Sequence, residues 1–243
     1  MINNILSKRI KSKIRKKVVK FITNNSGPYN PKDKWEVLAN ITEDDAPTVI
    51  DVGAAIESED SVYEILQNFH SPTIHAFEPR RNAAAEIERL YGERSGVHVW
   101  QLAVGSTSSR VDLNLGGGAS SVLEPSRELA DSHGGFEGRT EMVNQVSLDN
   151  FSKIEEADIL KMDIQGYEMD ALKGCKNLLE KVSVVMVEVN FMNIYESMSA
   201  QWEVDSFLRE RSFKLRNLYD IESKGGELVW ADAIYSKKKQ KNG

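Results

Sequence analysis

The sequence predicts an α/β fold in which helices cover both faces of a mostly parallel sheet. Five short, almost continuously apolar segments are separated by stretches of helical character, which is typical of parallel strands buried on both faces. Near the C-terminus, residues 212–238 read as two strands joined by a Lys-Gly-Gly turn, which predicts an antiparallel pair at one edge of the sheet. The 243 residues, 40% hydrophobic and 28% charged, suit one soluble domain with additions.

The expected elements alternate in chain order. The strands are the segments TVIDVG, TIHAFE, VHVWQLAV, DILKMD and VSVVMVEVNF, at residues 48–53, 73–78, 97–104, 158–163 and 182–191. The helices fit residues 59–69, 80–91, 167–180 and 200–211. Residues 105–150 differ, because SRVDLNL and TEMVNQVSLDNF flank the glycine-rich GGGASSVLEP, and we expect a β-hairpin insertion there.

The N-terminal segment has its own character. Residues 1–20 hold eight basic side chains and no acidic one, and apolar residues recur every fourth position from Ile2 to Ile22. This pattern predicts a basic amphipathic helix, with a linker up to residue 30. Two interpretations stay open: residues 1–22 contact a membrane surface or a protein partner, or they pack on their own domain or on a second subunit of a homo-oligomer. Residues 31–236 then form the main domain and 237–243 a disordered basic tail.

Charge and cysteine content narrow the classes of function. Residues 21–243 carry 23 basic and 37 acidic side chains, and an acidic body argues against nucleic acid as a partner. No apolar run approaches the length needed to span a bilayer. Cys175 is the only cysteine and suits a reducing compartment. We therefore expect a cytoplasmic protein, with any membrane contact peripheral and on the inner face.

The stretch TVIDVGAAIES predicts a cofactor-binding corner. Asp51, Gly53, Ala54 and Glu57 follow or end the first strand, where a glycine lets the backbone turn close to a ligand. Glu78 ends the second strand, and a carboxylate there accepts hydrogen bonds from both hydroxyls of an adenosine ribose. A dinucleotide loop has three glycines, whereas this loop has one, and Glu57 would repel a pyrophosphate. The corner therefore favours the sulfonium cofactor S-adenosyl-methionine over a nicotinamide dinucleotide.

From about residue 47 to 236 the chain resembles the FkbM-type methyltransferases, a family of class I S-adenosyl-methionine-dependent enzymes. The pieces VIDVGA, IHAFEP, LAVGS, VSLDNF, ILKMDIQGYEMDALKG and VVMVEVN carry the resemblance, in that order. It implies the class I methyltransferase (Rossmann-like) sheet and O-methylation of a hydroxyl, commonly on a sugar, glycolipid or polyketide. Two residues depart from the family pattern: Glu57 stands where glycine is usual, and Gln165 where a carboxylate is usual.

Candidate catalytic residues follow from the need for a proton acceptor near the sulfonium. Asp163, at the end of the fourth strand, is expected to hold the cofactor, to position the acceptor hydroxyl or to take its proton. Glu188 faces the same way as Asn190 on the fifth strand, and the alternatives of a Mg²⁺ ligand set and of a buried carboxylate stay open, without a metal in the expected site. His133, in the loop DSHGGFEG, is a candidate base, and Ala103 and Val104 are candidate walls for the adenine.

These inferences lead to one main hypothesis and one alternative. The main hypothesis is an S-adenosyl-methionine-dependent O-methyltransferase acting on a hydroxyl of a sugar, a glycan or a similar polyol. The alternative is a catalytically degenerate binding or scaffold protein on the same fold, at a membrane or partner surface. Glu57, Gln165 and the basic segment 1–22 motivate the alternative.

Overall fold

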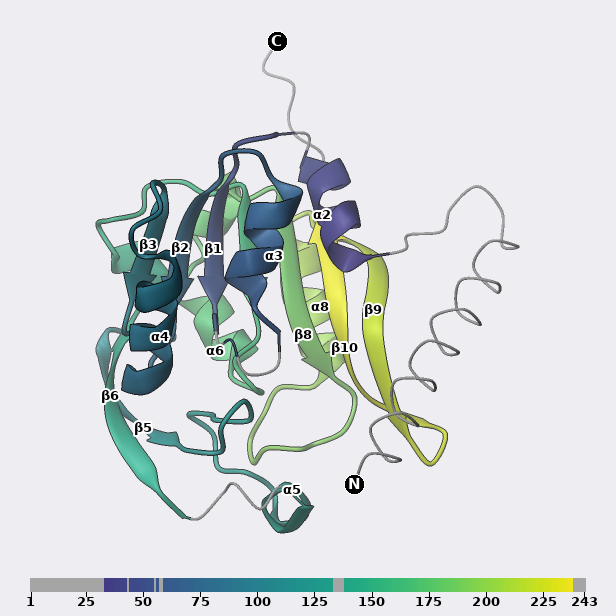
Figure 1. Cartoon of the computed structure of the whole chain (residues 1–243). Coiled ribbons are helices and arrows are strands. Elements are labelled where there is room, and N and C mark those ends of the chain that lie inside the picture. The colour runs from purple at the N-terminus through teal and green to yellow at the C-terminus, as the bar shows by residue number, and fades with distance from the viewer. Residues whose placement is uncertain (1–32, 43, 55, 57–58, 133–137, 238–243) are drawn as a thin grey trace, which may run out of the picture.

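The computed structural model describes residues 33–42, 44–54, 56, 59–132 and 138–237. Its centre is a seven-stranded sheet with the strand order β3-β2-β1-β7-β8-β10-β9 (Figure 1). The strands are β1 (Thr48–Val52), β2 (Thr73–Phe77), β3 (Val97–Trp100), β7 (Ile159–Met162), β8 (Val184–Asn190), β9 (Lys214–Lys224) and β10 (Glu227–Ser236). The neighbours from β3 to β8 pair in parallel, and β10 pairs antiparallel with both β8 and β9. The predicted mostly parallel sheet with an antiparallel C-terminal pair is therefore confirmed.

Helices cover both faces because successive strand residues point to opposite sides. In β1, Val49 packs into one apolar cluster and Ile50 into another, and both are fully buried. The first cluster lies under α2 (Lys34–Thr42), α3 (Ser61–Asn68) and α4 (Arg81–Tyr91). The second lies under α6 (Glu168–Lys173), α7 (Leu178–Lys181) and α8 (Gln201–Glu210), and Figure 1 shows α3 and α4 in front of the sheet.

The structure corrects three details of the predicted elements. Helix α2 lies in a stretch where no helix is predicted. The predicted strand 97–104 divides into β3 and β4 (Ala103–Val104), which belong to different sheets. The predicted helix 167–180 divides at Gly174, where a Cβ atom would lie 2.0 Å from the carbonyl oxygen of Gly105. Because the two backbones touch there, the chain turns instead of continuing one helix.

The insertion between β3 and β7 is a second, smaller sheet with the order β4-β6-β5. Strands β5 (Ser109–Asn114) and β6 (Thr140–Val146) pair antiparallel, which confirms strand pairing in this segment. The arrangement is not a simple hairpin, because a long connection with α5 (Arg127–Ser132) separates the two strands and β4 adds in parallel to β6. The short 3-10 helix η1 (Leu148–Asn150) leads back toward the main sheet.

Two segments, residues 116–126 and 191–198, form what we call the roof. They are joined by backbone hydrogen bonds, from Ser126 N–H to the Ile194 carbonyl at 3.0 Å and from Glu196 N–H to the Glu124 carbonyl at 2.8 Å. In Figure 1 they lie beyond the arrowheads of β1 and β8, at the carboxyl ends of the parallel strands. This edge is where α/β sheets bind ligands.

The ends of the chain lie largely outside the described residues. The predicted helix and linker of residues 1–30 and the tail residues 238–243 fall there, and so does any contact made through residues 1–22. Lys237 is described, and its Nζ atom donates to the carbonyl oxygens of Leu179 and Glu180, each at 2.7 Å. Within the described part, no helix combines the length and the apolar character that crossing a membrane requires.

Candidate active site

A cleft with about 720 Å³ of space, open to solvent, lies beyond the carboxyl ends of β1, β2 and β7. The main sheet contributes the polar side chains of Glu78, Lys161 and Asp163, and the roof closes the opposite wall with Gly117–Gly118 and Ser120–Val122. The cleft therefore joins the cofactor corner and the insertion into one site.

Gly53 lets the backbone enter this corner. Its φ angle is +81°, in the region that favours glycine, and its N–H donates to the carbonyl oxygen of Phe77 at 2.9 Å. A Cβ atom at this position would lie 1.9 Å from the carbonyl oxygen of Asp163. Only glycine therefore lets β1 and β7 end side by side at the floor of the cleft.

The Gly53→Ala variant is expected to lose about 3 kcal/mol of unfolding free energy, because strained φ and overpacking each cost about 1–3 kcal/mol. Gly225→Ala is a matched control, since Gly225 has a φ of +63° with nothing within 4 Å of an added Cβ. Thermal unfolding of both variants separates the cost of the strained φ angle, which both variants share, from the cost of the contact with Asp163, which only Gly53→Ala has. Equal losses in the two variants would show that the contact with Asp163 is unimportant.

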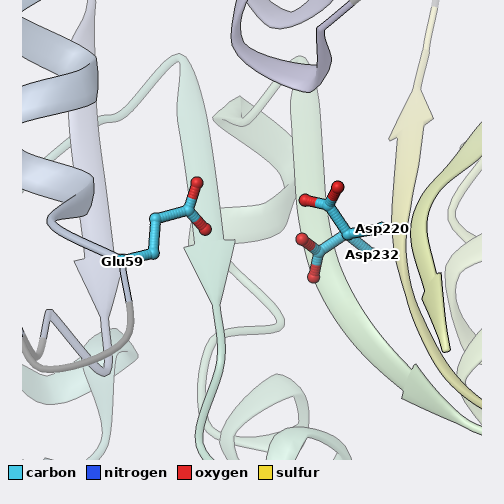
Figure 2. Close-up of side chains that lie close together, drawn as sticks. All are labelled: Glu59, Asp220 and Asp232. Atoms are coloured by element: carbon cyan, nitrogen blue, oxygen red, sulfur yellow. The ribbon is translucent and has the colours of Figure 1, made fainter. Parts of the chain in front are cut away.

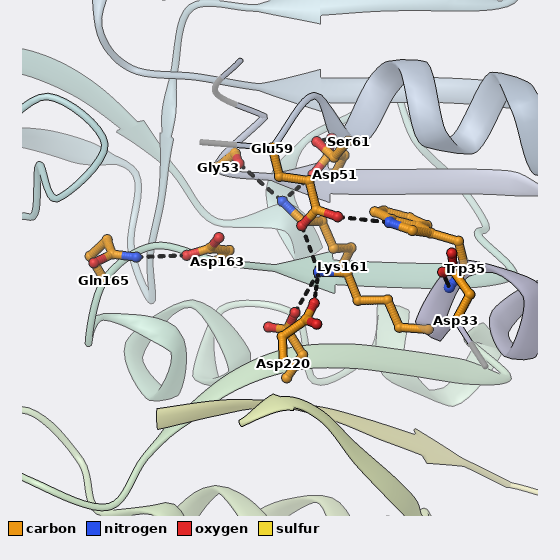
Figure 3. Close-up of polar contacts among 12 residues, drawn as sticks. Asp33, Trp35, Asp51, Gly53, Glu59, Ser61, Lys161, Asp163, Gln165 and Asp220 are labelled. Carbon is orange, nitrogen blue, oxygen red and sulfur yellow. Dashed lines mark hydrogen bonds and ion pairs between the residues drawn. The ribbon is translucent and has the colours of Figure 1, made fainter. Parts of the chain in front are cut away.

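Asp51 and Ala54 support the corner from behind, since both are fully buried and neither lines the cleft. An Oδ atom of Asp51 lies 2.9 Å from Lys161 Nζ, and its other oxygen accepts a hydrogen bond from the Ser61 hydroxyl at 2.5 Å (Figure 3). Lys161 also donates to the Gly53 carbonyl at 3.1 Å. The carboxylate of Asp51 thus anchors the start of α3 and the loop after β1.

Lys161 lines the cleft, although the sequence analysis did not select it. Burial lowers the pKa of its ammonium, but Asp51 and Asp163 outweigh this effect and the pKa is raised. The side chain is 8% exposed and lines the floor of the cleft. The signal in the sequence was a charged residue in the middle of the apolar strand ILKM.

Glu78 lies where the ribose acid is expected, at the end of β2, lining the cleft and 3% exposed. Arg80 holds it: the backbone N–H and Nε of Arg80 donate to one Glu78 oxygen at 2.8 and 3.0 Å. An Arg80 terminal nitrogen donates to the other oxygen at 3.2 Å, and the second donates to the Gly117 carbonyl at 2.9 Å. Arg80 therefore orients the carboxylate and connects it to the roof.

The apolar wall next to Glu78 suits an adenine ring. Ala103 and Val104 are buried and line the cleft, together with Phe77 and Leu102. The small side chain of Ala103 leaves room for a flat ring beside it. The structure therefore places both residues in the cleft, and their contact with the adenine stays a prediction.

Asp163 follows the end of β7 and lines the cleft between Lys161 and Gln165. Its Oδ1 atom accepts a hydrogen bond from Gln165 Nε2 at 2.8 Å (Figure 3). Its backbone N–H donates to the Val52 carbonyl at 3.0 Å, which fixes it against β1. Of the two predicted catalytic residues that the structure describes, Asp163 and Glu188, only Asp163 lines the cleft.

Glu188 is buried on β8 and does not line the cleft. Burial, together with Asp163, Glu168 and Asp232, raises the pKa of Glu188 well above its ordinary range. Asn190 Nδ2 donates a hydrogen bond to Glu188 at 3.3 Å. Glu188 is thus a buried acid beneath the site, paired with Asn190 and not with Lys161.

Glu168 closes the turn that presents Asp163. It accepts hydrogen bonds from the backbone N–H groups of Ile164 at 3.0 Å and of Gly166 at 3.2 Å. Burial raises the pKa of Glu168 to about 7, since it outweighs the lowering effect of these N–H groups, and Asp163 adds to the rise. The carboxyl group of Glu168 is therefore partly protonated at neutral pH.

This raised pKa predicts a pH dependence of stability. Between about pH 4.5 and pH 7 the folded chain binds more protons at Glu168 than the unfolded chain, so the unfolding free energy falls as pH rises through this window. Glu168→Gln should reduce this fall, whereas Glu88→Gln, which removes an exposed acid on α4, should leave it unchanged. Urea unfolding at pH 5, 6 and 7 measures the slopes. An equal slope in Glu168→Gln and the wild type would contradict the assignment.

Glu59 is a second residue that the pattern reading missed, since the sequence pointed to Glu57, which lies outside the described residues. Carboxylate oxygens of Glu59, Asp220 and Asp232 lie within 4.8 Å of one another (Figure 2). The Lys34 ammonium lies 2.5, 2.9 and 2.6 Å from them, so a cation of the chain itself already fills this cluster. The cluster therefore attaches α2 to the rim of the cleft.

His133, the third predicted catalytic residue, lies outside the described residues, and its proposed role as a base stays a prediction. The two serines of GGGASS line the cleft but use their hydroxyls within the protein. Ser120 donates to the Gly117 carbonyl and Ser121 to the Gln165 carbonyl, each at 2.7 Å. They therefore shape the roof more than they offer free hydroxyls to an acceptor.

The residues present fit S-adenosyl-methionine. The glycine turn at Gly53 and the buried carboxylate of Glu78 suit its amino-acid end and its ribose, and the apolar wall suits its adenine. The acids around Asp163 suit a sulfonium cation and would oppose a pyrophosphate. Fold and cleft together define a class I S-adenosyl-methionine-dependent methyltransferase.

The chain belongs to the FkbM methyltransferase family, since the family model of the methyltransferase FkbM domain matches residues 51–215. The 2-O-methyltransferase NoeI of Sinorhizobium fredii (strain NBRC 101917 / NGR234) is 23% identical over 172 residues, 65% of this chain and 70% of that protein. The crystal structure of a methyltransferase FkbM from Methylobacillus flagellatus KT is 17% identical, with a TM-score of 0.51 over 79% of this chain. The match covers 44% of that solved chain, and this likeness shows the fold alone.

Proposed function

We propose that the protein transfers a methyl group from S-adenosyl-methionine to a hydroxyl oxygen of a sugar, a glycan or a similar polyol. The observation that carries the proposal is the position of Asp163, a carboxylate that opens onto the same cleft as Glu78. A hydroxyl acceptor needs a hydrogen-bond partner that takes up its proton, and a carboxylate at this edge meets that need. The name of the relative NoeI, a 2-O-methyltransferase, supports oxygen as the acceptor atom.

Different residues of this chain bind the cofactor, orient the acceptor and accept its proton. When bound, S-adenosyl-methionine supplies a methyl group already activated on a sulfonium. Glu78 accepts hydrogen bonds from the ribose hydroxyls, and Ala103 and Val104 form the wall next to the adenine. Asp163 orients the acceptor hydroxyl and accepts its proton as the oxygen reacts. The roof excludes water over the reacting atoms, so that positioning contributes a large share of the rate, up to about 7–11 kcal/mol for ideal alignment.

The alternative of a degenerate scaffold protein is not favoured. Gln165 keeps its polar contact to Asp163, and Gly53 and Glu78 both lie at the cleft. The proposed setting is cytoplasmic, in line with the single cysteine, Cys175, which is buried and unpaired in the described structure. A peripheral contact through residues 1–22 remains part of the prediction from the sequence.

Titration calorimetry of the purified protein with S-adenosyl-methionine and with S-adenosyl-homocysteine tests the cofactor. We expect binding well below millimolar concentration, and no heat of binding at millimolar ligand would refute the proposal. A panel of mono- and oligosaccharides, followed by mass spectrometry for a mass gain of one methylene, tests the acceptor. Methylation of nitrogen or carbon acceptors in place of hydroxyls would still identify a methyltransferase, but it would rule out hydroxyls as the acceptor class.

A further inference from the structure

The side chain of Gln165 connects Asp163 to the roof. Its Nε2 atom donates to Asp163 Oδ1 at 2.8 Å, and its Oε1 atom accepts from the Tyr195 hydroxyl at 3.0 Å. An amide serves both contacts at once because it carries a donor and an acceptor. A carboxylate at this position would accept from Tyr195 and have no hydrogen to donate to Asp163.

The backbone of Gln165 is held just as firmly. Its φ angle is +57°, which is uncommon outside glycine and persists only where surrounding contacts enforce it. Its carbonyl accepts from the Ser121 hydroxyl at 2.7 Å. Tyr195 is 1% exposed, and its hydroxyl also lies within hydrogen-bond distance of the Ala119 carbonyl, at 2.8 Å. Both segments of the roof therefore contact Gln165.

The amide of Gln165 matters because most of the ionisable groups around Asp163 are acids. The groups that act on Asp163 from the packed elements are Lys161 on β7, Glu168 on α6, Glu188 on β8, Asp232 on β10 and Tyr195 in the roof. Three of the five are acids, and the one cation, Lys161, is paired with Asp51. A hydrogen bond donated to a carboxylate stabilises its ionised form, whereas a second carboxylate in contact destabilises it.

We propose that Gln165 is a positioning residue that holds the Asp163 carboxylate aimed into the cleft and couples it through Tyr195 to the roof. This inference rests on the proposed function, because it assigns Gln165 to the same site. The role belongs to the amide, since the neighbouring contacts require one donor and one acceptor. The departure of this chain from the family pattern at residue 165 is then a working part of the site.

The first test is Gln165→Glu, which places two carboxylates in contact. Such a pair holds a proton to higher pH than one carboxylate, and a bound sulfonium cation expels it. We expect this variant to release about half a proton more than the wild type on binding S-adenosyl-methionine at pH 6. Titration calorimetry in buffers of different ionisation enthalpy measures the number of protons released. Gln67→Glu, which adds the same charge at an exposed position of α3, should match the wild type.

The second test is Gln165→Gly, which removes the side chain and adopts a positive φ without steric cost. We expect unchanged thermal stability and a Kd for S-adenosyl-homocysteine weakened about tenfold, as for the loss of one hydrogen bond to a charged group. Hydrogen exchange of residues 116–126 in the bound protein should become faster than in the wild type. If the role of Gln165 were purely structural, Gln165→Gly would lower thermal stability and Gln165→Glu would leave the number of released protons unchanged.

Two results would overturn the inference. One is an equal proton release in Gln165→Glu and the wild type, and the other is a Kd in Gln165→Gly within twofold of the wild-type value. If the wild type itself binds neither S-adenosyl-methionine nor S-adenosyl-homocysteine, the proposed function fails first. The two failures are therefore distinguishable in one set of titrations.

Discussion

Glu78→Ala is expected to abolish detectable binding of S-adenosyl-methionine, with Kd raised by more than about 100-fold. In the proposed function two ribose hydroxyls donate to this carboxylate, and a hydrogen bond to a charged group contributes about 1.5–3 kcal/mol. The variant also removes the contacts of Arg80 with this carboxylate, whereas the contact of Arg80 with the Gly117 carbonyl stays. Titration calorimetry with S-adenosyl-methionine and S-adenosyl-homocysteine measures the loss.

Glu78→Gln is the matched control for this variant. It keeps the volume of the side chain and one acceptor oxygen but loses the charge, so we expect a Kd between those of the wild type and Glu78→Ala. Thermal unfolding with and without S-adenosyl-homocysteine separates folding from binding, because ligand at 100 times Kd stabilises by about 2.7 kcal/mol. If Glu78→Ala binds the cofactor within tenfold of the wild type, the ribose does not lie at the end of β2.

Asp163→Ala is expected to lower turnover by about 10²–10⁴-fold, the usual contribution of a general base, while Kd for the cofactor changes about tenfold or less. The carboxylate opens onto the cleft and meets Gln165, so its removal leaves one amide donor without a partner. Single-turnover formation of S-adenosyl-homocysteine, at saturating cofactor and acceptor, measures the chemical step apart from binding.

Asp163→Asn tests what the carboxylate contributes beyond its shape. The amide retains an oxygen that accepts from Gln165 but neither the negative charge nor the capacity to take a proton. A base role predicts a slow Asp163→Asn enzyme with wild-type thermal stability. A positioning role predicts substantial activity in Asp163→Asn and little in Asp163→Ala. Wild-type turnover in both variants would remove Asp163 from the reaction.

Much of the fold was predictable because parallel strands buried on both faces read as continuous apolar runs. The segments that became β1, β2, β7 and β8 were of this kind. Helix α2 was not predictable in the same way, because it is held by contacts distant in the chain. Lys34 bonds to Glu59 and Asp232, and Trp35 donates to Glu59 at 2.9 Å. The division of residues 97–104 between two sheets likewise depends on β6, which pairs with β4 from 36 or more residues away.

The candidate site, like the fold, was predictable only in part. Glu78 and Asp163 were predictable because both lie at the carboxyl ends of strands, which meet at one edge of a parallel sheet. Asp51 carries the same chemistry in the same corner, yet it pairs with Lys161 across neighbouring strands, in register. No pattern within a single strand indicates that pairing, since it depends on which residue of β7 lies beside β1.

The sequence by itself determined the class of fold, the cofactor and the two strand ends that carry Glu78 and Asp163, because local apolar patterns and turn residues encode strands and where they end. The tertiary structure alone decided which acids reach the cleft, which are paired or buried, and that Gln165 meets both Asp163 and Tyr195. Such contacts depend on side chains brought together from distant segments, and burial and partners then set the charge that each group carries.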